Sequence, residues 1–364
     1  MLLKNLIKVL NDIAPFQLQA SYDNSGLQVG IPEQEVSKGL ICLDVTMPVI
    51  DEAIKNGCDL ILCHHPLIFK GIKKISDEQP TGRIIIESIR HGIAIVAVHT
   101  NLDNAYHGVN YELGKRLGLK NLKILEPASG MLKKLVTFCP LAQADLVRAA
   151  IFEAGAGQIG DYDCCSFNLE GKGSFRAGEN TNPFTGKIQE LHYEPEVRIE
   201  TIFPAYLQAS VLSAMLNAHP YEEVAYDIYP LDNAFDRVGS GMVGNYDKPL
   251  KVNQFLDIIK KLLDVPFVRH TKFDKDEIQR VAICGGSGSF LMQRALQSGV
   301  QAFLTADVKY HQFFEAHGKI LLVDAGHFET EQFSIDLLYS QLKKKIATFA
   351  FLISETNTNP VNYF

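Results

Sequence analysis

Two adjacent histidines, His64 and His65, interrupt an apolar segment that reads LILCHHPLIF between residues 60 and 69. On a regular strand two neighbouring side chains point to opposite faces. At a strand's end, where Pro66 changes the direction of the chain, both imidazoles can turn toward one site. Imidazole nitrogen is a common ligand of divalent metal ions. The pair therefore predicts a metal site, in which adjacent ligands could serve two closely spaced ions.

Carboxylates and a third histidine occur in similar places. Asp103 ends the segment IAIVAVHTNLD, and DAGHFETE at residues 324–331 contains His327 and Glu331, four residues apart. If a helix begins near Gly326, these two side chains share one of its faces. A carboxylate such as Glu331 can bridge two ions, as in two-metal hydrolases. The predicted metal ligands are His64, His65, Asp103, His327 and Glu331.

Four further polar residues at segment ends have two interpretations each. Asp44 and His99 could orient a metal ligand, or could cap the end of a strand. Lys309 and His311, in the segment ADVKYHQ, could supply charge for a phosphate or transfer a proton, or could belong to a solvated helix start. His99, His311 and Lys309 are therefore the catalytic candidates.

The segment CGGSGSF at residues 284–290 follows a strand pattern and precedes a helical one. Its backbone amides could cradle a phosphate, but its spacing is neither G-x-G-x-x-G nor that of a P-loop. The alternative is a tight strand-to-helix turn that needs glycine. The candidate phosphate-binding residues are Gly285, Gly286, Ser287 and Gly288. The remaining histidines are interpreted as surface or packing residues: His91, His107, His192, His219, His270 and His317.

The elements that must position these residues share one pattern, a β-branched apolar run followed by a polar cluster. Helical patterns such as MPVIDEAIKNG and GRIIIESIRHG lie between such runs. This alternation predicts an α/β fold with a largely parallel sheet covered on both faces, in which ligands bind beyond the carboxyl ends of the strands. The runs lie at residues 38–46, 58–66, 93–103, 279–289, 300–311 and 319–331.

The middle of the chain differs. LVTFCPLAQADLVRAAIFEAGAG and RIETIFPAYLQASVLSAMLNAHP are two strand-Pro-helix units, each followed by a further strand. Two βαβ units predict a ferredoxin-like α+β module, with EGKGSFRAGENTNPFTGK as a long loop or hairpin between them. We therefore predict a split α/β domain, with its first half at residues 1–127, an inserted module at 128–245 and its second half at 246–364.

Composition excludes several classes. The formal net charge of the 364 residues is −7, which argues against a general nucleic-acid-binding protein. Seven scattered cysteines without a C-x-x-C pair fit neither a disulfide framework nor a thiolate zinc site, and suggest a reducing, cytoplasmic location. MLLKNLIKVLNDIAPF has its leucines at helical spacing, broken by charges, which predicts an amphipathic helix ending before Pro15 rather than a signal peptide. No apolar stretch is long enough to cross a bilayer.

Together these segments resemble the family of GTP cyclohydrolase 1 type 2 homologues, or Nif-three-like proteins. The matching stretches are SYDNSGLQVG, LDVT, LILCHHPLIF, AVHTNLDNAYHGVN, GGSGS, TADVKYHQ and DAGHFETE. The resemblance implies two metal ions, with His65, Asp103 and His327 on one, His64 on the other, and Glu331 bridging both. It also implies that the inserted module is PII-like and that the protein is a homohexamer built from trimers.

Two functions are compatible with this site. The first is a metal-dependent hydrolase acting on a nucleotide such as GTP, or on another phosphorylated small molecule, through a metal-activated water. The second is a non-catalytic metal-binding regulator or scaffold, with a PII-like module that senses a small molecule. Nitrogen and oxygen ligands without cysteine do not choose among zinc, iron and manganese, so two divalent ions per subunit are expected without a fixed identity.

Overall fold

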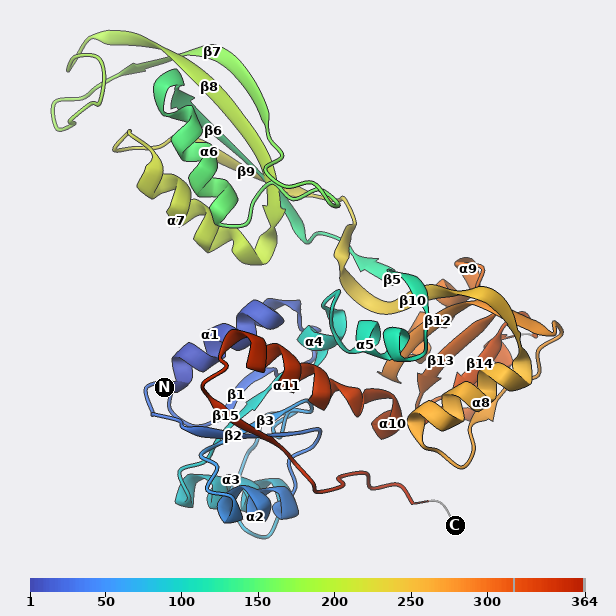
Figure 1. Ribbon diagram of the computed structural model, residues 1–364. Coiled ribbons are helices and arrows are strands. Elements are labelled where there is room, and N and C mark those ends of the chain that lie inside the picture. Colours follow the sequence, from blue (N-terminus) through green and yellow to red (C-terminus); the bar gives the residue numbers. More distant parts are fainter. Residues whose placement is uncertain (317, 363–364) are drawn as a thin grey trace. The chain divides into compact units, whose positions relative to one another are not determined.

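The computed structural model describes residues 1–316 and 318–362, so His317 lies outside the described residues. The chain forms two compact units (Figure 1). Unit 1 combines Met1–Pro127 with Arg237–Phe364, and unit 2 is Ala128–Asp236. All five predicted metal ligands belong to unit 1.

One sheet of unit 1 contains the first three predicted strands. Its order is β1-β4-β3-β2-β15, with β15, β2, β3 and β4 parallel and β1 antiparallel to β4. The parallel strands β2, β3 and β4 are uninterrupted apolar runs, as expected of strands covered on both faces. The bounds are β1 (Gly26–Val29), β2 (Lys38–Cys42), β3 (Leu60–Cys63), β4 (Ala94–Ala97) and β15 (Ala350–Ile353).

The other three predicted strands form a second, mixed sheet, so the expectation of one largely parallel sheet was wrong. The order is β11-β14-β13-β12-β10-β5, in which β12, β13 and β14 are parallel, while β11 is antiparallel to β14 and β10 to β12. β5 alternates exposed residues such as Lys123 with buried ones such as Leu122, a pattern that suits a sheet edge. The bounds are β5 (Lys120–Ala128), β10 (Phe235–Lys251), β11 (Arg269–His270), β12 (Glu277–Ser287), β13 (Ala302–Ala306) and β14 (Leu321–Asp324).

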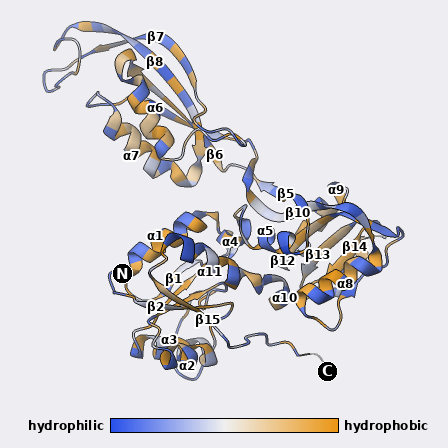
Figure 2. Cartoon of the chain, in the orientation of Figure 1, coloured by the Kyte–Doolittle hydropathy of each residue, from blue (hydrophilic) through white to orange (hydrophobic). Residues whose placement is uncertain are grey.

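The helices of unit 1 are amphipathic and cover both sheets (Figure 2). In α1 the leucines Leu3, Leu6 and Leu10 are buried, and the helix ends before Pro15 as predicted. Proline in the first turn starts α2 and α3. The bounds are α1 (Leu3–Ile13), α2 (Met47–Lys55), α3 (Pro80–Arg90), α4 (Thr100–Asn104), α5 (Val109–Arg116), α8 (Val252–Leu263), α9 (Met292–Gln297), α10 (His327–Glu331) and α11 (Phe333–Lys345), with 3₁₀ turns η1 (Phe16–Leu18), η4 (Ser289–Leu291) and η5 (Tyr310–Ala316).

The buried side chains show which helices hold each sheet. Val49 of α2 and Ile84 of α3 pack on Ile61 and its neighbours in the first sheet. In the second sheet, α5 and α8 cover one face, where Phe255 is fully buried, while α9 covers the other through Met292. Burial of this kind stabilises the fold by about 25 cal/mol per Å² of apolar surface. It fixes the strand ends at which the candidate residues lie.

Unit 2 has the element order β-α-β-β-α-β. Its four strands form a sheet in the order β7-β8-β6-β9, and all neighbours are antiparallel. Both helices cover one face of this sheet, where Val147 and Val211 pack on Ile199. The bounds are β6 (Leu132–Pro140), η2 (Leu141–Gln143), α6 (Ala144–Glu153), β7 (Phe167–Arg176), β8 (Leu191–Pro204), η3 (Ala205–Leu207), α7 (Gln208–Ala218) and β9 (Tyr226–Leu231).

None of the helices in residues 1–316 and 318–362 has the length and apolar character needed to span a membrane.

Candidate metal centre

The candidate ligands come from strand ends of both sheets in unit 1. His64 and His65 follow β3 directly, and Asp103 lies on the short helix α4 after β4. From the second sheet, α10 begins at His327 after β14 and carries Glu331 one turn later. In each sheet the carboxyl ends of the parallel strands meet at one edge. Residues that are far apart in the chain therefore come together where these ends of the two sheets meet.

The Nε2 atoms of two histidines meet one oxygen of Glu331. His65 Nε2 lies 2.9 Å and His327 Nε2 3.0 Å from Glu331 Oε2, and the two nitrogens are 3.4 Å apart. His64 Nε2 lies 3.8 Å from the same oxygen and 3.6 Å from Asp103 Oδ1. Nitrogen and carboxylate oxygen therefore surround a small volume at the centre of the cluster.

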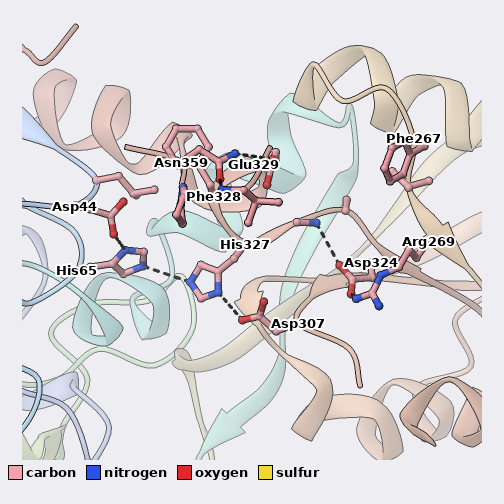
Figure 3. A pocket seen from close by; sticks show the side chains of 16 residues that line it. Asp44, His65, Phe267, Arg269, Asp307, Asp324, His327, Phe328, Glu329 and Asn359 are labelled. Atoms are coloured by element: carbon pink, nitrogen blue, oxygen red, sulfur yellow. Dashed lines mark hydrogen bonds and ion pairs between the residues drawn. The ribbon is translucent and has the colours of Figure 1, made fainter. Parts of the chain in front are cut away.

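The other ring nitrogen of each histidine is held by an oxygen acceptor. His64 Nδ1 donates to the carbonyl of Val98 at 2.9 Å. His65 Nδ1 donates to Asp44 Oδ1 at 2.7 Å, and His327 Nδ1 donates to Asp307 Oδ2 at 2.6 Å (Figure 3). This pattern fixes the tautomer that leaves Nε2 as the coordinating atom, and it surrounds the histidine ligands of most metal sites.

The residues fit a metal ion because one of their buried donor atoms has no partner within the described protein. His64 Nε2 is buried and has no hydrogen-bond partner among the described residues, an arrangement that costs about 1–3 kcal/mol when nothing compensates it. Three groups of residues each have their donor atoms within 4.8 Å of one another. They are His65 with His327 and Glu331, His64 with Asp103 and Glu331, and His64 with His65 and His99. Glu331 belongs to two of them, as a bridging carboxylate would.

The protonation equilibria show how strongly these groups interact. Burial lowers the pKa of His64 to about 3, which keeps its ring neutral. Burial alone would also lower the pKa of His65, but the hydrogen bonds to Asp44 and Glu331 raise it to about 10. Burial and the neighbouring Glu331 carboxylate hold the pKa of Asp103 well above its usual range. Without an added cation, two carboxylates and several imidazoles compete for protons in one small volume.

The glycines at the end of β12, Gly285 and Gly286, lie against this cluster. A Cβ on Gly286 would meet Glu331 Oε1 at 2.1 Å, and Gly286 has a φ of +58°, in the left-handed region. Its amide donates to Thr330 Oγ1 at 3.0 Å. The backbone therefore approaches the carboxylate of Glu331 more closely than any residue with a side chain would allow.

A model of one protein family, Duf34/NIF3 (NGG1p interacting factor 3), matches residues 1–360. The chain belongs to the DUF34/NIF3 family. The predicted resemblance to GTP cyclohydrolase 1 type 2 homologues is confirmed by relatives of that name. The Bacillus subtilis protein is 37% identical over 99% of this chain and 98% of its own length. The Halalkalibacterium halodurans protein is 40% identical over 89% of this chain and 88% of its own length.

Two solved structures support the fold. A Bacillus cereus protein related to NIF3 has a TM-score of 0.88 and 37% identity, covering 100% of this chain and 99% of its own. A Staphylococcus aureus protein has a TM-score of 0.78 and 31% identity, covering 100% of this chain and 99% of its own. The mixed α/β architecture with several sheets is therefore common to this chain and these neighbours.

The structure of this DUF34/NIF3 chain brings all five predicted ligands together. It groups Asp103 with His64 and Glu331, whereas the resemblance placed Asp103 with His65 and His327. Asp44 contacts the ring of His65, which is the orienting role considered for it. His99 precedes α4 as its N-cap residue, and its ring centroid lies 5.4 Å from that of His65.

The predicted phosphate loop is not supported. The amides of Gly285, Gly286 and Gly288 donate to side-chain oxygens of Asn110, Thr330 and Thr305. Three of the four N–H groups expected to cradle a phosphate are thus already used. Glycine is required here by the approach to Glu331, so the alternative of a tight turn is the better interpretation of the motif.

Lys309 and His311 lie away from the cluster. Both are exposed, and neither lines the two cavities next to the ligands. His311 contacts Tyr310 and Phe314 instead. The structure therefore does not bring these two candidates to the cluster, whereas His99 lines the larger of the two cavities.

Two aspartates of the site were missed. Asp307 follows β13 directly, so the rule that selected the other strand ends applies to it as well as to Lys309 and His311. Asp23 accepts from His99 Nδ1 at 2.7 Å and from Thr100. Burial alone would raise the pKa of Asp23, but these hydrogen bonds hold it far below its usual range. Asp23 lies outside any strand end, and its one sequence signal was its place in the family-matching stretch SYDNSGLQVG.

Two cavities share His65 and His327 as wall residues. The smaller, about 490 Å³, is lined by Asp44, Asp307, Phe328 and Asn359 among others (Figure 3). The larger, about 720 Å³, also contains Asp103 and Glu331. Its apolar surface comes from Tyr22, Phe69 and Phe290.

Substituting Asn for Asp307 should weaken metal binding about tenfold, the lower end of the range for groups that orient a ligand. Asp307 has a φ of +54°, which asparagine tolerates, so the backbone should not change. Asp264→Asn is the matched control, since Asp264 has the same φ of +54° at the end of α8. Titration with a competing chelator measures both affinities, and equal affinities would contradict the role given to Asp307.

The segment after β15 also contacts the ligands' supports. Thr358 Oγ1 donates to Asp44 Oδ2 at 2.8 Å, while Asp44 Oδ1 holds His65. Thr358→Val removes this hydroxyl at nearly constant volume and should speed metal release about fivefold, less than loss of a direct support. The control is Thr356→Val, because Thr356 bonds to Glu52. Release into excess chelator provides the rate, and equal rates for the two variants would remove Thr358 from the site.

Proposed function

We propose that this chain holds two divalent metal ions, of zinc, iron or manganese type. His65 and His327 would hold one ion, His64 and Asp103 the other, and Glu331 would bridge them. The observation that carries this proposal is the convergence of three Nε2 atoms on Glu331 while each Nδ1 is held by an oxygen. Mixed nitrogen and oxygen ligands without cysteine suit these metals.

The activity that fits such a site is metal-dependent hydrolysis. When bound, the ions would lower the pKa of a water molecule and so provide a nucleophile at neutral pH. The larger cavity would hold the substrate, since it contains Asp103 and Glu331. His99 lines the same cavity, and its Nδ1 is anchored by Asp23, so its Nε2 is the group placed to give a proton to the leaving atom.

The relatives' name suggests a guanine nucleotide as substrate, with attack of water on the imidazole carbon of the base and protonation as the ring opens. Tyr22, Phe69 and Phe290 offer surfaces on which a flat base could stack. No lysine or arginine is among the described residues that line this cavity. Phosphate groups would therefore depend on the ions and on neutral donors such as Asn110, so we propose a nucleotide or related ring-bearing small molecule.

Three variants separate the roles of the histidines. His65→Ala should lose an ion and all turnover, because it removes a ligand. His99→Gln should keep the metal and lower turnover at least about 100-fold, the usual effect of removing a general acid. His311→Ala should change neither. Elemental analysis and turnover of GTP and a panel of phosphoesters, on the same samples, provide both readouts. Metal loss in His99→Gln would make His99 a ligand instead.

A non-catalytic regulator or scaffold is the competing function. Metal-loaded protein that turns over neither GTP nor any phosphoester, while retaining its ions, would favour it. Protein purified without chelators and free of divalent metal would remove the basis of both proposals.

We also propose that unit 2 is the inserted ferredoxin-like, PII-like module predicted for residues 128–245. Its β-α-β-β-α-β order and its sheet order support this, because a ferredoxin-like sheet places the first and third strands side by side at its centre. The homohexamer and the cytoplasmic location are carried by the family resemblance and the reduced-cysteine interpretation. Light scattering of the purified protein tests the hexamer.

A further inference from the structure

Unit 2 contains a cavity of its own, of about 440 Å³. Its floor is the sheet face opposite the two helices, formed by β6, β7 and β8. Its walls are the loop at residues 177–184 and the connection at 221–225, which precedes β9. Glu222 accepts the backbone N–H of Asn182 at 2.9 Å, and this bond ties the loop to the connection. The cavity is thus built by four stretches of the chain: Phe138 of β6, residues 173–184, Glu196 of β8 and residues 221–225.

Two glycines of β7 leave room on this face. Gly171 pairs with Glu196 and Gly173 with Glu194 across the β7–β8 ladder, so both glycines share a face with these glutamates. A Cβ on Gly173 would meet Glu196 Oε2 at 2.1 Å, whereas a Cβ on Gly171 would meet nothing within 4 Å. The carboxylate of Glu196 therefore occupies the space that a side chain at residue 173 would fill.

Four aromatic residues line this cavity. Tyr221 lies between Phe175 and Phe184, with ring centroids 6.3 Å and 6.2 Å away. Phe138 contributes a further ring from β6. Tyr221 donates its hydroxyl to Glu196 Oε1 at 2.8 Å, which fixes the ring and the carboxylate together. The faces of such rings carry negative electrostatic potential and attract cations.

The charged side chains of the lining have the same preference. Glu196, Glu222 and Glu223 contribute three carboxylates, against one guanidinium from Arg176. None of these residues belongs to the groups of donor atoms that could hold a metal ion within the described chain. An acidic, aromatic cavity without metal-ligand geometry suits an organic cation, whose charge lies near the carboxylates and whose apolar body lies on the rings.

We propose that this cavity of unit 2 binds an organic cation, an amine or quaternary ammonium carried on a flat or apolar body. The site is separate from the metal centre and does not depend on its activity. Glu196 and Tyr221 are its central residues, and Gly173 leaves the space that the Glu196 carboxylate occupies. Such a ligand would give the inserted unit a recognition role of its own.

Benzyltrimethylammonium is the probe, because it has no lone pair with which to ligate a metal. Titration calorimetry on the full-length protein should show saturable binding of one molecule per chain. Benzylsulfonate, of similar size and opposite charge, should bind at least about tenfold more weakly. The neutral benzyl alcohol should fall between them. His65→Ala should bind the cation unchanged, which separates this site from the metal centre.

Matched variants test the residues. Glu196→Gln keeps an acceptor for Tyr221 and should weaken binding of the cation about tenfold. Glu200→Gln, on the same face of β8 but paired with Lys134, should not. Gly173→Ala should weaken binding by displacing the Glu196 carboxylate, and Gly171→Ala should leave it unchanged. Absence of saturable binding, equal binding of cation and anion, or equal effects within either pair would overturn the proposal.

Discussion

Glu331→Gln should remove both metal ions from the protein. Glu331 Oε2 is the one atom that faces His64, His65 and His327 together, at 3.8, 2.9 and 3.0 Å. Burial alone would raise the pKa of Glu331, but the imidazoles that face it hold the pKa well below its usual range. Glutamine has the same shape without the charge, and cannot bridge two cations. We expect affinity to fall by more than about 100-fold, beyond the range for groups that only orient a ligand.

Glu329→Gln is the control for this substitution. Glu329 is also buried on α10, but its Oε1 accepts from Asn359 rather than facing the histidines. Elemental analysis and chelator competition should show two ions in the control and none in Glu331→Gln. Thermal unfolding of both variants, recorded without metal, shows whether each has folded. A folded Glu331→Gln protein that keeps both ions at unchanged affinity would refute the bridging role.

The sequence predicted which polar residues come together better than it predicted the sheets, for a physical reason. His64, His65 and His327 lie at the ends of short apolar runs, and such runs are strands whose carboxyl ends converge in any parallel arrangement. Whether the runs of the two halves join one sheet or two depends on their neighbours. In the second half, β10 and the edge strand β5 decide this, and their pairing joins segments more than a hundred residues apart.

The supporting residues were harder to predict than the ligands. Asp44 and Asp307 follow strands, so the strand-end rule could find them, and it found Asp44. Asp23 and Thr358 reach the site from segments without regular structure, through contacts with His99 and Asp44. Such contacts depend on the final folded path of a loop. No local pattern of apolar and polar residues encodes them.

The motif CGGSGSF is compatible with two structural roles. Glycines after a strand suggest free amides for an anion, and they equally permit a close approach of the backbone to another group. Here the amides are used by Asn110, Thr330 and Thr305, and the approach is to Glu331. The glycines would then matter for metal binding, although they provide no ligand.

Gly286→Ala should therefore disable the metal centre without changing any ligand. The new Cβ would lie 2.1 Å from Glu331 Oε1 and 3.2 Å from His327 Cε1, so the carboxylate must move away from the histidines. We expect metal affinity to fall at least about tenfold, as for loss of a group that orients a ligand. The left-handed φ adds a backbone cost of about 1–2 kcal/mol, and the overpacking about 1–3 kcal/mol more.

Gly299→Ala separates these two costs. Gly299 has a φ of +70°, but a Cβ there would meet nothing within 4 Å. The free energy of unfolding of Gly299→Ala should fall only by the backbone cost of about 1–2 kcal/mol, and its metal affinity should not change. Chemical denaturation measures the stability of both variants without metal, and chelator competition measures affinity. If Gly286→Ala and Gly299→Ala behaved alike in both measurements, Gly286 would be needed only for the local backbone conformation, and the metal centre would not depend on the space it leaves for Glu331.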